Sequence, residues 1–189
     1  PRDQRLHAAV SHFVYGPTTH YSDDLGKTWT QAKQVPLITR PSKSGRPAST
    51  VDEAFRSEGG EDIKDKPEKM IQVWNITPGR ASEPNVLYAG AQPASLYISK
   101  DRGETWELNE TLFDHPHRGQ WNPGAGGLCL HTIVLDPTNE KRMYIAVSAA
   151  GCYRTDDGGQ TWHPFNKNVR ADFMPDKFPE FGQCVHKMT

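Results

Sequence analysis

The 189-residue sequence predicts an all-β fold made of repeated four-stranded antiparallel meanders. An octet with the pattern [Ser/Thr]-x-Asp-x-Gly-x-Thr-Trp occurs three times, at residues 22–29, 99–106 and 155–162. Short runs rich in β-forming residues lie at even spacing between the octets, divided by Gly, Pro and Asn. The order of runs and turns before the second octet recurs before the third, so the chain is a repeat protein.

Each octet predicts a tight turn between two antiparallel strands. An Asp and a Gly two residues later supply a side-chain bond to the backbone and a residue that can take positive φ. The Ser or Thr ends one strand, and Thr-Trp begins the next with a β-former and a large apolar ring. We therefore expect structural roles, with the Trp rings buried between strands, for Asp24, Gly26, Trp29, Asp101, Gly103, Trp106, Asp157, Gly159 and Trp162.

The octet resembles the Asp-box, or BNR repeat, of β-propellers, a class that includes sialidases, xyloglucanases, sortilin-type receptors and photosystem assembly factors. The resemblance covers nearly the whole chain outside residues 39–69. It implies that each meander is a propeller blade, with its box at the outer rim between the third and fourth strands. It also implies that the first strand of each blade lines a central channel. The expected fold is about three blades, forming a partial or oligomer-completed propeller.

The elements are expected in the following order along the chain. Blade 1 spans about 1–38 and lacks its first strand, an insertion spans 39–69, blade 2 spans about 70–112, a mouth loop spans 113–127, blade 3 spans about 128–168, a loop spans 169–182, and residues 183–189 form the first strand of a further blade. The insertion is rich in Ser, Gly, Pro and charge and lacks periodicity. It indicates a solvated loop, with a binding lid as the alternative.

Composition excludes several partners. The 22 Lys and Arg residues balance 23 Asp and Glu residues without a basic stripe, so nucleic acid is not an expected partner. No apolar run approaches the ~20 residues of a membrane span. Cys129, Cys152 and Cys184 cannot all pair within the chain, and they lack metal-ligand spacing. They are interpreted as buried thiols of a reducing compartment, which favours a cytoplasmic location and leaves secretion open.

A candidate ligand-binding site is expected at the channel mouth. Alignment of the first strands places one ring-bearing residue of each at the same register. The Gly- and Pro-rich mouth loop adds further titratable and aromatic side chains above them. The expected site residues are Trp74, His131 and His186 from the strands and His115, His117, Arg118 and Trp121 from the loop. No cofactor is expected, although a metal at His131 and His186 is an alternative to hydrogen-bonded histidines of the repeat.

The leading functional hypothesis is a non-catalytic Asp-box propeller that serves as a binding scaffold for a glycan or protein ligand. The alternative is a glycoside hydrolase, which requires two facing carboxylates. The candidates are the loop acids Asp114, Asp172, Asp176 and Glu180, whose other interpretation is as solvated surface groups. The sialidase resemblance would imply an arginine cluster and a tyrosine nucleophile. Arg118 and Arg170 occupy suitable loops, but no third arginine and no tyrosine stands at an inner-strand position, so a sialidase site does not carry over. Catalytic residues are therefore unassigned.

Three blades are too few to close around an axis, because propellers use roughly four to eight. Self-association or further blades are therefore needed to close the propeller. In the first case, residues 183–189 of one copy supply the first strand that blade 1 of another copy lacks, giving a six-bladed ring with two-fold symmetry. In the second case, the sequence is part of a longer propeller.

Overall fold

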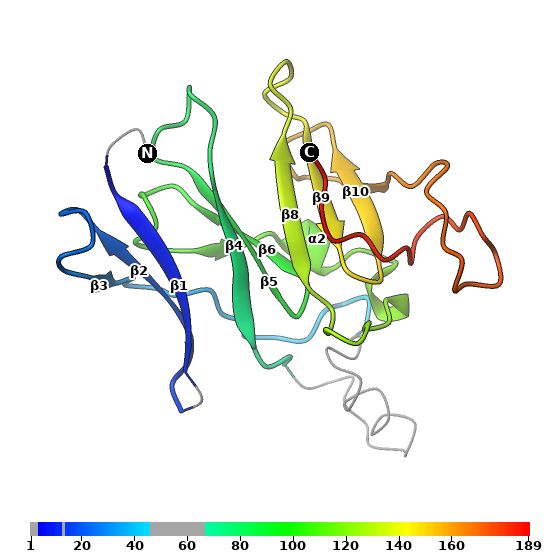
Figure 1. Ribbon diagram of the computed structural model, residues 1–189, viewed down its shortest axis with the longest axis horizontal. Coiled ribbons are helices and arrows are strands. Elements are labelled where there is room, and N and C mark those ends of the chain that lie inside the picture. The colour runs from blue at the N-terminus through cyan, green and yellow to red at the C-terminus, as the bar shows by residue number, and fades with distance from the viewer. Residues whose placement is uncertain (1–3, 13, 46–66) are drawn as a thin grey trace.

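The computed structural model describes residues 4–12, 14–45 and 67–189 (Figure 1). These residues form three antiparallel sheets, with short helical turns at α2 (Glu110–Phe113) and η1 (Arg118–Gln120). The expected fold class, all-β with propeller blades, is confirmed. Within the described ranges, no helix is long and apolar enough to cross a membrane.

Each sheet is a meander in which the strands pair in chain order. Blade 1 contains β1 (Leu6–His12), β2 (Gly16–Ser22) and β3 (Thr30–Gln31). Blade 2 contains β4 (Gln72–Pro78), β5 (Leu87–Gln92), β6 (Ser95–Ser99) and β7 (Glu107–Leu108). Blade 3 contains β8 (Leu130–Leu135), β9 (Met143–Val147), β10 (Gly151–Thr155) and β11 (His163–Pro164). An Asp-box precedes the last strand of each blade.

The three blades present one edge strand each to a common face. Strands β1, β4 and β8 lie side by side there, with the C-terminal segment next to β8 (Figure 1). The hydrophobic core lies between the blades rather than within one of them, since a single sheet cannot bury its own faces. One cluster joins Leu96 of blade 2 to Tyr153 of blade 3, and the other joins Ile38, after blade 1, to Tyr97 of blade 2.

The Asp-box turn is closed by its own side chains. In the third box, the Gly159 amide donates to Thr155 Oγ1 at 2.8 Å. The Asp157 carboxylate accepts from the Thr161 amide at 2.9 Å and from its hydroxyl at 2.6 Å. Equivalent bonds occur in the other two boxes. Gly159 has a φ of +90°, a conformation that glycine takes without steric cost.

The expectation that all three box tryptophans are buried is wrong for the first. Trp106 and Trp162 are 2% and 4% exposed, whereas Trp29 is 44% exposed. Each buried ring is covered by the chain segment that follows the preceding blade. Ile38 belongs to the same buried cluster as Trp106, and Asn109 Oδ1 accepts from Trp162 Nε1 at 3.0 Å. Among the described residues, Trp29 belongs to neither buried cluster.

The expected strand at residues 183–189 is also corrected, because these residues form no strand. They run beside β8, where Thr132 Oγ1 donates to the His186 carbonyl at 3.2 Å (Figure 1). A first strand of a blade forms its ladder with the second strand, and no described strand pairs with residues 183–189. The segment therefore holds the position of an inner strand without a ladder.

The insertion 39–69 is described only at residues 39–45 and 67–69, so the expected solvated loop or lid lies mostly outside the described residues. Its described ends are attached to the mouth loop. Arg40 forms an ion pair with Asp114 at 2.8 Å, and Glu68 forms one with Arg118 at 2.8 Å.

Candidate ligand-binding site

The first strands of blades 2 and 3 carry a β-bulge at the same place. The ladder register shifts across Trp74 in β4 and across His131 in β8. A bulge leaves its residue unpaired and re-aims the side chain. The two rings consequently meet across the blade boundary, edge to face, with centroids 4.9 Å apart.

A side-chain hydrogen bond holds each inner segment against the next. Asn75 Nδ2, one residue after Trp74, donates to the His131 carbonyl at 2.6 Å. Thr132, one residue after His131, donates in the same way to the His186 carbonyl. The His131 and His186 rings then lie 5.0 Å apart. Trp74, His131 and His186 form a continuous line of rings across three successive inner segments, which we call the ring row.

The central residue of the ring row, His131, is uncharged at neutral pH. Burial, followed by the nearby His186, lowers the pKa of His131, so its imidazole is neutral at pH 7. Its Nε2 atom has no hydrogen-bond partner among the described residues. Trp74 is 44% exposed and donates through Nε1 to Gln92 Oε1 at 3.3 Å. The ring row therefore offers an exposed aromatic face beside a neutral imidazole.

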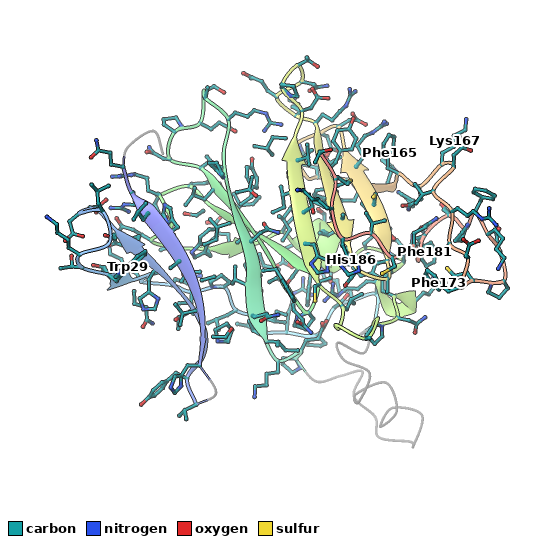
Figure 2. The ribbon with its side chains drawn as sticks, viewed as in Figure 1. Trp29, Phe165, Lys167, Phe173, Phe181 and His186 are labelled. Carbon is teal, nitrogen blue, oxygen red and sulfur yellow. The ribbon has the colours of Figure 1, made fainter. Side chains whose placement is uncertain are left out.

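A cavity of about 410 Å³ opens between the mouth loop and the loop 169–182. Its walls are apolar side chains and glycines with two amide groups: Gln120, Asn122, Pro123, Gly124, Ala149, Phe173, Met174, Phe181, Gly182 and Cys184. Figure 2 shows Phe173 and Phe181 close together and His186 further toward β8. Cys184 joins the cavity to the ring row, because its Sγ lies 3.2 Å from His186 Nε2.

Cys184 corrects one sequence prediction, since its side chain is exposed while Cys129 and Cys152 are buried. Burial raises the pKa of Cys129 to about 11, so that thiol is neutral and unreactive at pH 7. In the described parts of the chain, no group of three or more His, Cys, Asp or Glu residues is placed to hold a metal ion.

The four predicted site residues of the mouth loop fold inward, and three of them, His115, His117 and Trp121, anchor the loop to blade 3. The His115 imidazole bonds through Nε2 to the Trp162 carbonyl at 3.2 Å. Trp121 Nε1 donates to the Tyr153 hydroxyl at 2.9 Å. His117 stacks on Phe181 with centroids 4.2 Å apart, so it supports one wall of the cavity. No hydrogen bond or ring contact joins His115, His117 or Trp121 to the ring row within the described residues.

Arg118 is the most deeply buried of the predicted site residues. Its Nη2 atom donates to both carboxylate oxygens of Glu68, at 2.9 and 2.8 Å, and both side chains are fully buried. It also lies 4.4 Å from the centroid of the Phe113 ring. Because its charge is already paired inside the fold, Arg118 holds the mouth loop in place and is not available to bind a ligand.

The loop acids do not form a facing pair. Asp114 accepts from Arg40, and this hydrogen bond lowers the Asp114 pKa to about 2, the opposite of what a general acid needs. Asp172 pairs with Arg170 at 2.7 Å, and Asp176 accepts from the Phe178 amide at 2.9 Å. Glu180 lies with His115 and His117 along a second hollow beside Trp162.

The sequence analysis singled out the two loops that form the cavity but not its aromatic wall. Phe173 and Phe181 are large apolar residues in a polar, Pro-containing loop, where an exposed aromatic residue is a signal of binding. Their convergence with Pro123 and Gly124 depends on the fold of both loops, which residue spacing does not reveal.

Comparison with known proteins identifies the repeats. The family model described as BNR/Asp-box repeat matches residues 20–31, 97–108 and 153–164. The oligoxyloglucan-reducing end-specific xyloglucanase of Emericella nidulans is 28% identical over 88 residues, which cover 46% of this chain and 10% of the relative. The chain thus spans about a tenth of the length of that relative.

Solved structures of low similarity were also found. The GH74 enzyme of Niastella koreensis has a TM-score of 0.48 and 18% identity, covering 92% of this chain and 21% of its own. The GH74 xyloglucanase of Xanthomonas campestris has a TM-score of 0.37 and 16% identity, covering 87% and 29%. The structure of YCF48 bound to D1 peptide has a TM-score of 0.34 and 16% identity, covering 82% and 48%.

Proposed function

We propose that this array of BNR/Asp-box blades binds a glycan chain along the ring row and in the adjoining cavity, and that the described residues do not hydrolyse it. The observation that carries this proposal is the continuity of the surface. The cavity walls reach Cys184, which touches His186, and the ring row then continues to His131 and Trp74.

The chemistry of the surface suits sugar rings. An exposed aromatic ring offers a flat apolar face at small entropic cost, and Trp74 and Phe173 are both exposed. Binding pockets combine such apolar walls with a few polar groups that fix orientation. Here the amides of Gln120 and Asn122 are the polar groups of the wall, and they can donate to and accept from sugar hydroxyls.

The similarity to an oligoxyloglucan-reducing end-specific xyloglucanase supports xyloglucan oligosaccharides as the ligand class to test first. It also keeps glycoside hydrolysis as the second candidate. The arrangement of the acids argues against hydrolysis by this chain alone. Asp114 is held ionised by Arg40, and Asp172 is engaged by Arg170, so neither is a free acid facing a second carboxylate.

The test is calorimetric titration of the chain with xyloglucan oligosaccharides, together with an assay for newly formed reducing ends. We expect binding without reducing-end release, and at least about tenfold weaker binding for Trp74→Ala and Phe173→Ala, a loss of roughly 1.4 kcal/mol. Phe178→Ala is the matched control, because Phe178 is exposed on the same loop but does not line the cavity.

Equal affinity for Phe173→Ala and the wild-type chain, or an absence of binding at millimolar ligand, would overturn the proposal. Release of reducing ends that is lost in a Glu180→Gln variant would favour the hydrolase instead.

A further inference from the structure

The hairpin between β1 and β2 is longer than the equivalent hairpins of the other two blades. Counted back from the Asp-box, the same ladder position is held by Thr18, Ser95 and Gly151. Beyond it, blades 2 and 3 return to the preceding strand through three residues, whereas blade 1 uses seven, residues 11–17. The additional residues extend the ladder of blade 1 by two pairs, as far as His12.

The tip of this hairpin is exposed, and its own side chains hold its turn. His12 Nδ1 accepts from the amides of Val14 and Tyr15, at 3.1 and 3.3 Å. The Tyr15 ring packs on the His12 ring, with centroids 4.9 Å apart. Tyr15 is 81% exposed, whereas Ala94 and Ala150, in the shorter connections of blades 2 and 3, are fully buried. The extension therefore presents an aromatic ring on an ordered turn.

The tip lies at the mouth end of the blades. Figure 1 shows it at the same end of the molecule as the start of β4 and the mouth loop before β8. Strand β1 contacts β4 and runs in the opposite direction, and His7 lines one cavity with Ile76 near the other end of both strands. At about 3.3 Å per residue, His12 lies about 16 Å along the hairpin from His7, and Trp74 lies about 7 Å along β4 from Ile76. The tip therefore extends roughly 10 Å beyond Trp74 on the mouth side.

The hairpin carries no formally charged side chain. None of the residues 6–22 is Asp, Glu, Lys or Arg, although these four types make up 24% of the chain. Its polar side chains are hydroxyls and imidazoles, which can donate to and accept from sugar hydroxyls. His131, at the centre of the ring row, is uncharged at neutral pH as well. Both surfaces therefore suit a neutral ligand that stacks on aromatic rings, and neither offers an ion pair to a charged one.

We propose that the β1–β2 hairpin is a second contact for the glycan of the ring row, with Tyr15 as its aromatic platform. The proposal rests on the proposed glycan binding and adds the class of ligand, a neutral chain long enough to reach from Trp74 to Tyr15. The occupant is the glycan because the tip continues an uncharged aromatic surface at the same end of the molecule. The extension is defined against the hairpins of blades 2 and 3, so it holds whatever blades flank this chain.

Calorimetric titration with xyloglucan oligosaccharides of increasing length tests the second contact. The affinity of the wild-type chain should rise by a further step once the oligosaccharide is long enough to reach the hairpin. Tyr15→Ala should remove this step, with about fivefold weaker binding of the long oligosaccharides and unchanged binding of the short ones. Tyr15→Phe keeps the ring and should keep the step. Trp74→Ala should weaken binding at every length, and Phe178→Ala, at an exposed ring outside both contacts, should weaken none.

A shortened hairpin tests the extension itself. Deletion of residues 12–15 leaves three residues between Val10 and Thr18, the length that blades 2 and 3 use. The shortened chain should bind the short oligosaccharides as the wild-type chain does and should lose the step at greater length. Circular dichroism and thermal unfolding check that it is folded, and the point variant Tyr15→Ala carries the test if it is not.

The outcomes separate this proposal from the glycan binding on which it rests. If Trp74→Ala weakens binding but Tyr15→Ala retains the full affinity for long oligosaccharides, the hairpin is no glycan contact and the ring row stands alone. The same holds if the wild-type chain binds short and long oligosaccharides equally. An absence of binding at every length overturns both proposals.

Discussion

The Asp157 carboxylate bridges two donors of one residue, the backbone amide and the side-chain hydroxyl of Thr161, at 2.9 and 2.6 Å. These bonds, together with those from Thr155 and Gln160, lower the pKa of Asp157 well below its usual range. The folded state therefore binds the proton less readily than the unfolded chain does. The carboxylate stabilises the fold above pH about 4, and this contribution is lost as the pH falls.

Asp157→Asn should accordingly be less stable than the wild-type chain at pH 7, and the difference should shrink between pH 4 and pH 2.5. Urea unfolding at several pH values measures it. Asp176→Asn, in the exposed loop, should have a much smaller effect at pH 7. A difference between Asp157→Asn and wild type that is the same at both ends of this range would contradict the assignment.

The box tryptophans should differ in their contribution to stability according to their coverage. Trp106→Ala removes a ring that is 2% exposed and should lower the free energy of unfolding by about 3–5 kcal/mol. Trp29→Ala removes a ring that is 44% exposed and should cost less than half as much in dilute protein. Denaturant unfolding compares them. Equal losses would mean that Trp29 is also covered in solution under those conditions.

His115 should make stability depend on pH near neutrality. Desolvation, followed by the nearby His117, lowers its pKa. The neutral ring satisfies both nitrogens, since Nδ1 accepts from the His117 amide and Nε2 faces the Trp162 carbonyl. The unfolded chain binds a proton at pH about 6.5, but the folded chain resists it. Stability is therefore full above that pH and falls as the pH drops through the window below it.

Unfolding measured between pH 7.5 and 5.0 should show this decline, and His115→Gln should make it shallower. His12→Gln is the control, because His12 is exposed and lies in β1 of blade 1. His131, whose pKa burial also lowers, should account for part of the decline that His115→Gln leaves. An unchanged slope in His115→Gln would show that the folded protein accommodates the charged ring.

Removing only one partner of the Arg118–Glu68 ion pair should lower the stability of the fold. Arg118→Ala removes the positive charge that faces the buried Glu68 carboxylate and should destabilise the fold by about 3–5 kcal/mol. Arg118→Met combined with Glu68→Leu removes both charges and should recover most of that loss. Thermal unfolding of the two variants gives the comparison. If the double variant is as unstable as the single one, packing rather than charge pairing dominates at this site.

The repeat chemistry was predictable from the sequence because it is local. In each box, the first Ser or Thr bonds to the Asp and the Gly, and the Asp bonds to the second Thr, all within five residues, so their spacing alone predicts the turn. The alternating runs predicted the meanders, since neighbouring strands of a meander pair through short connections. The matching register of Trp74, His131 and His186 came from the same alignment, and the structure brings these three rings together.

Tertiary structure alone decided which side chains are available to a ligand. Arg118 looks like an exposed loop cation in the sequence, but Glu68, 50 residues earlier, buries and neutralises it. Phe173 and Phe181 become a binding wall because two loops separated by a whole blade converge. Trp29 has the same local sequence as Trp106 and Trp162, yet it is exposed. Burial depends on the neighbouring blade, and local pattern carries no information about whether that neighbour is present.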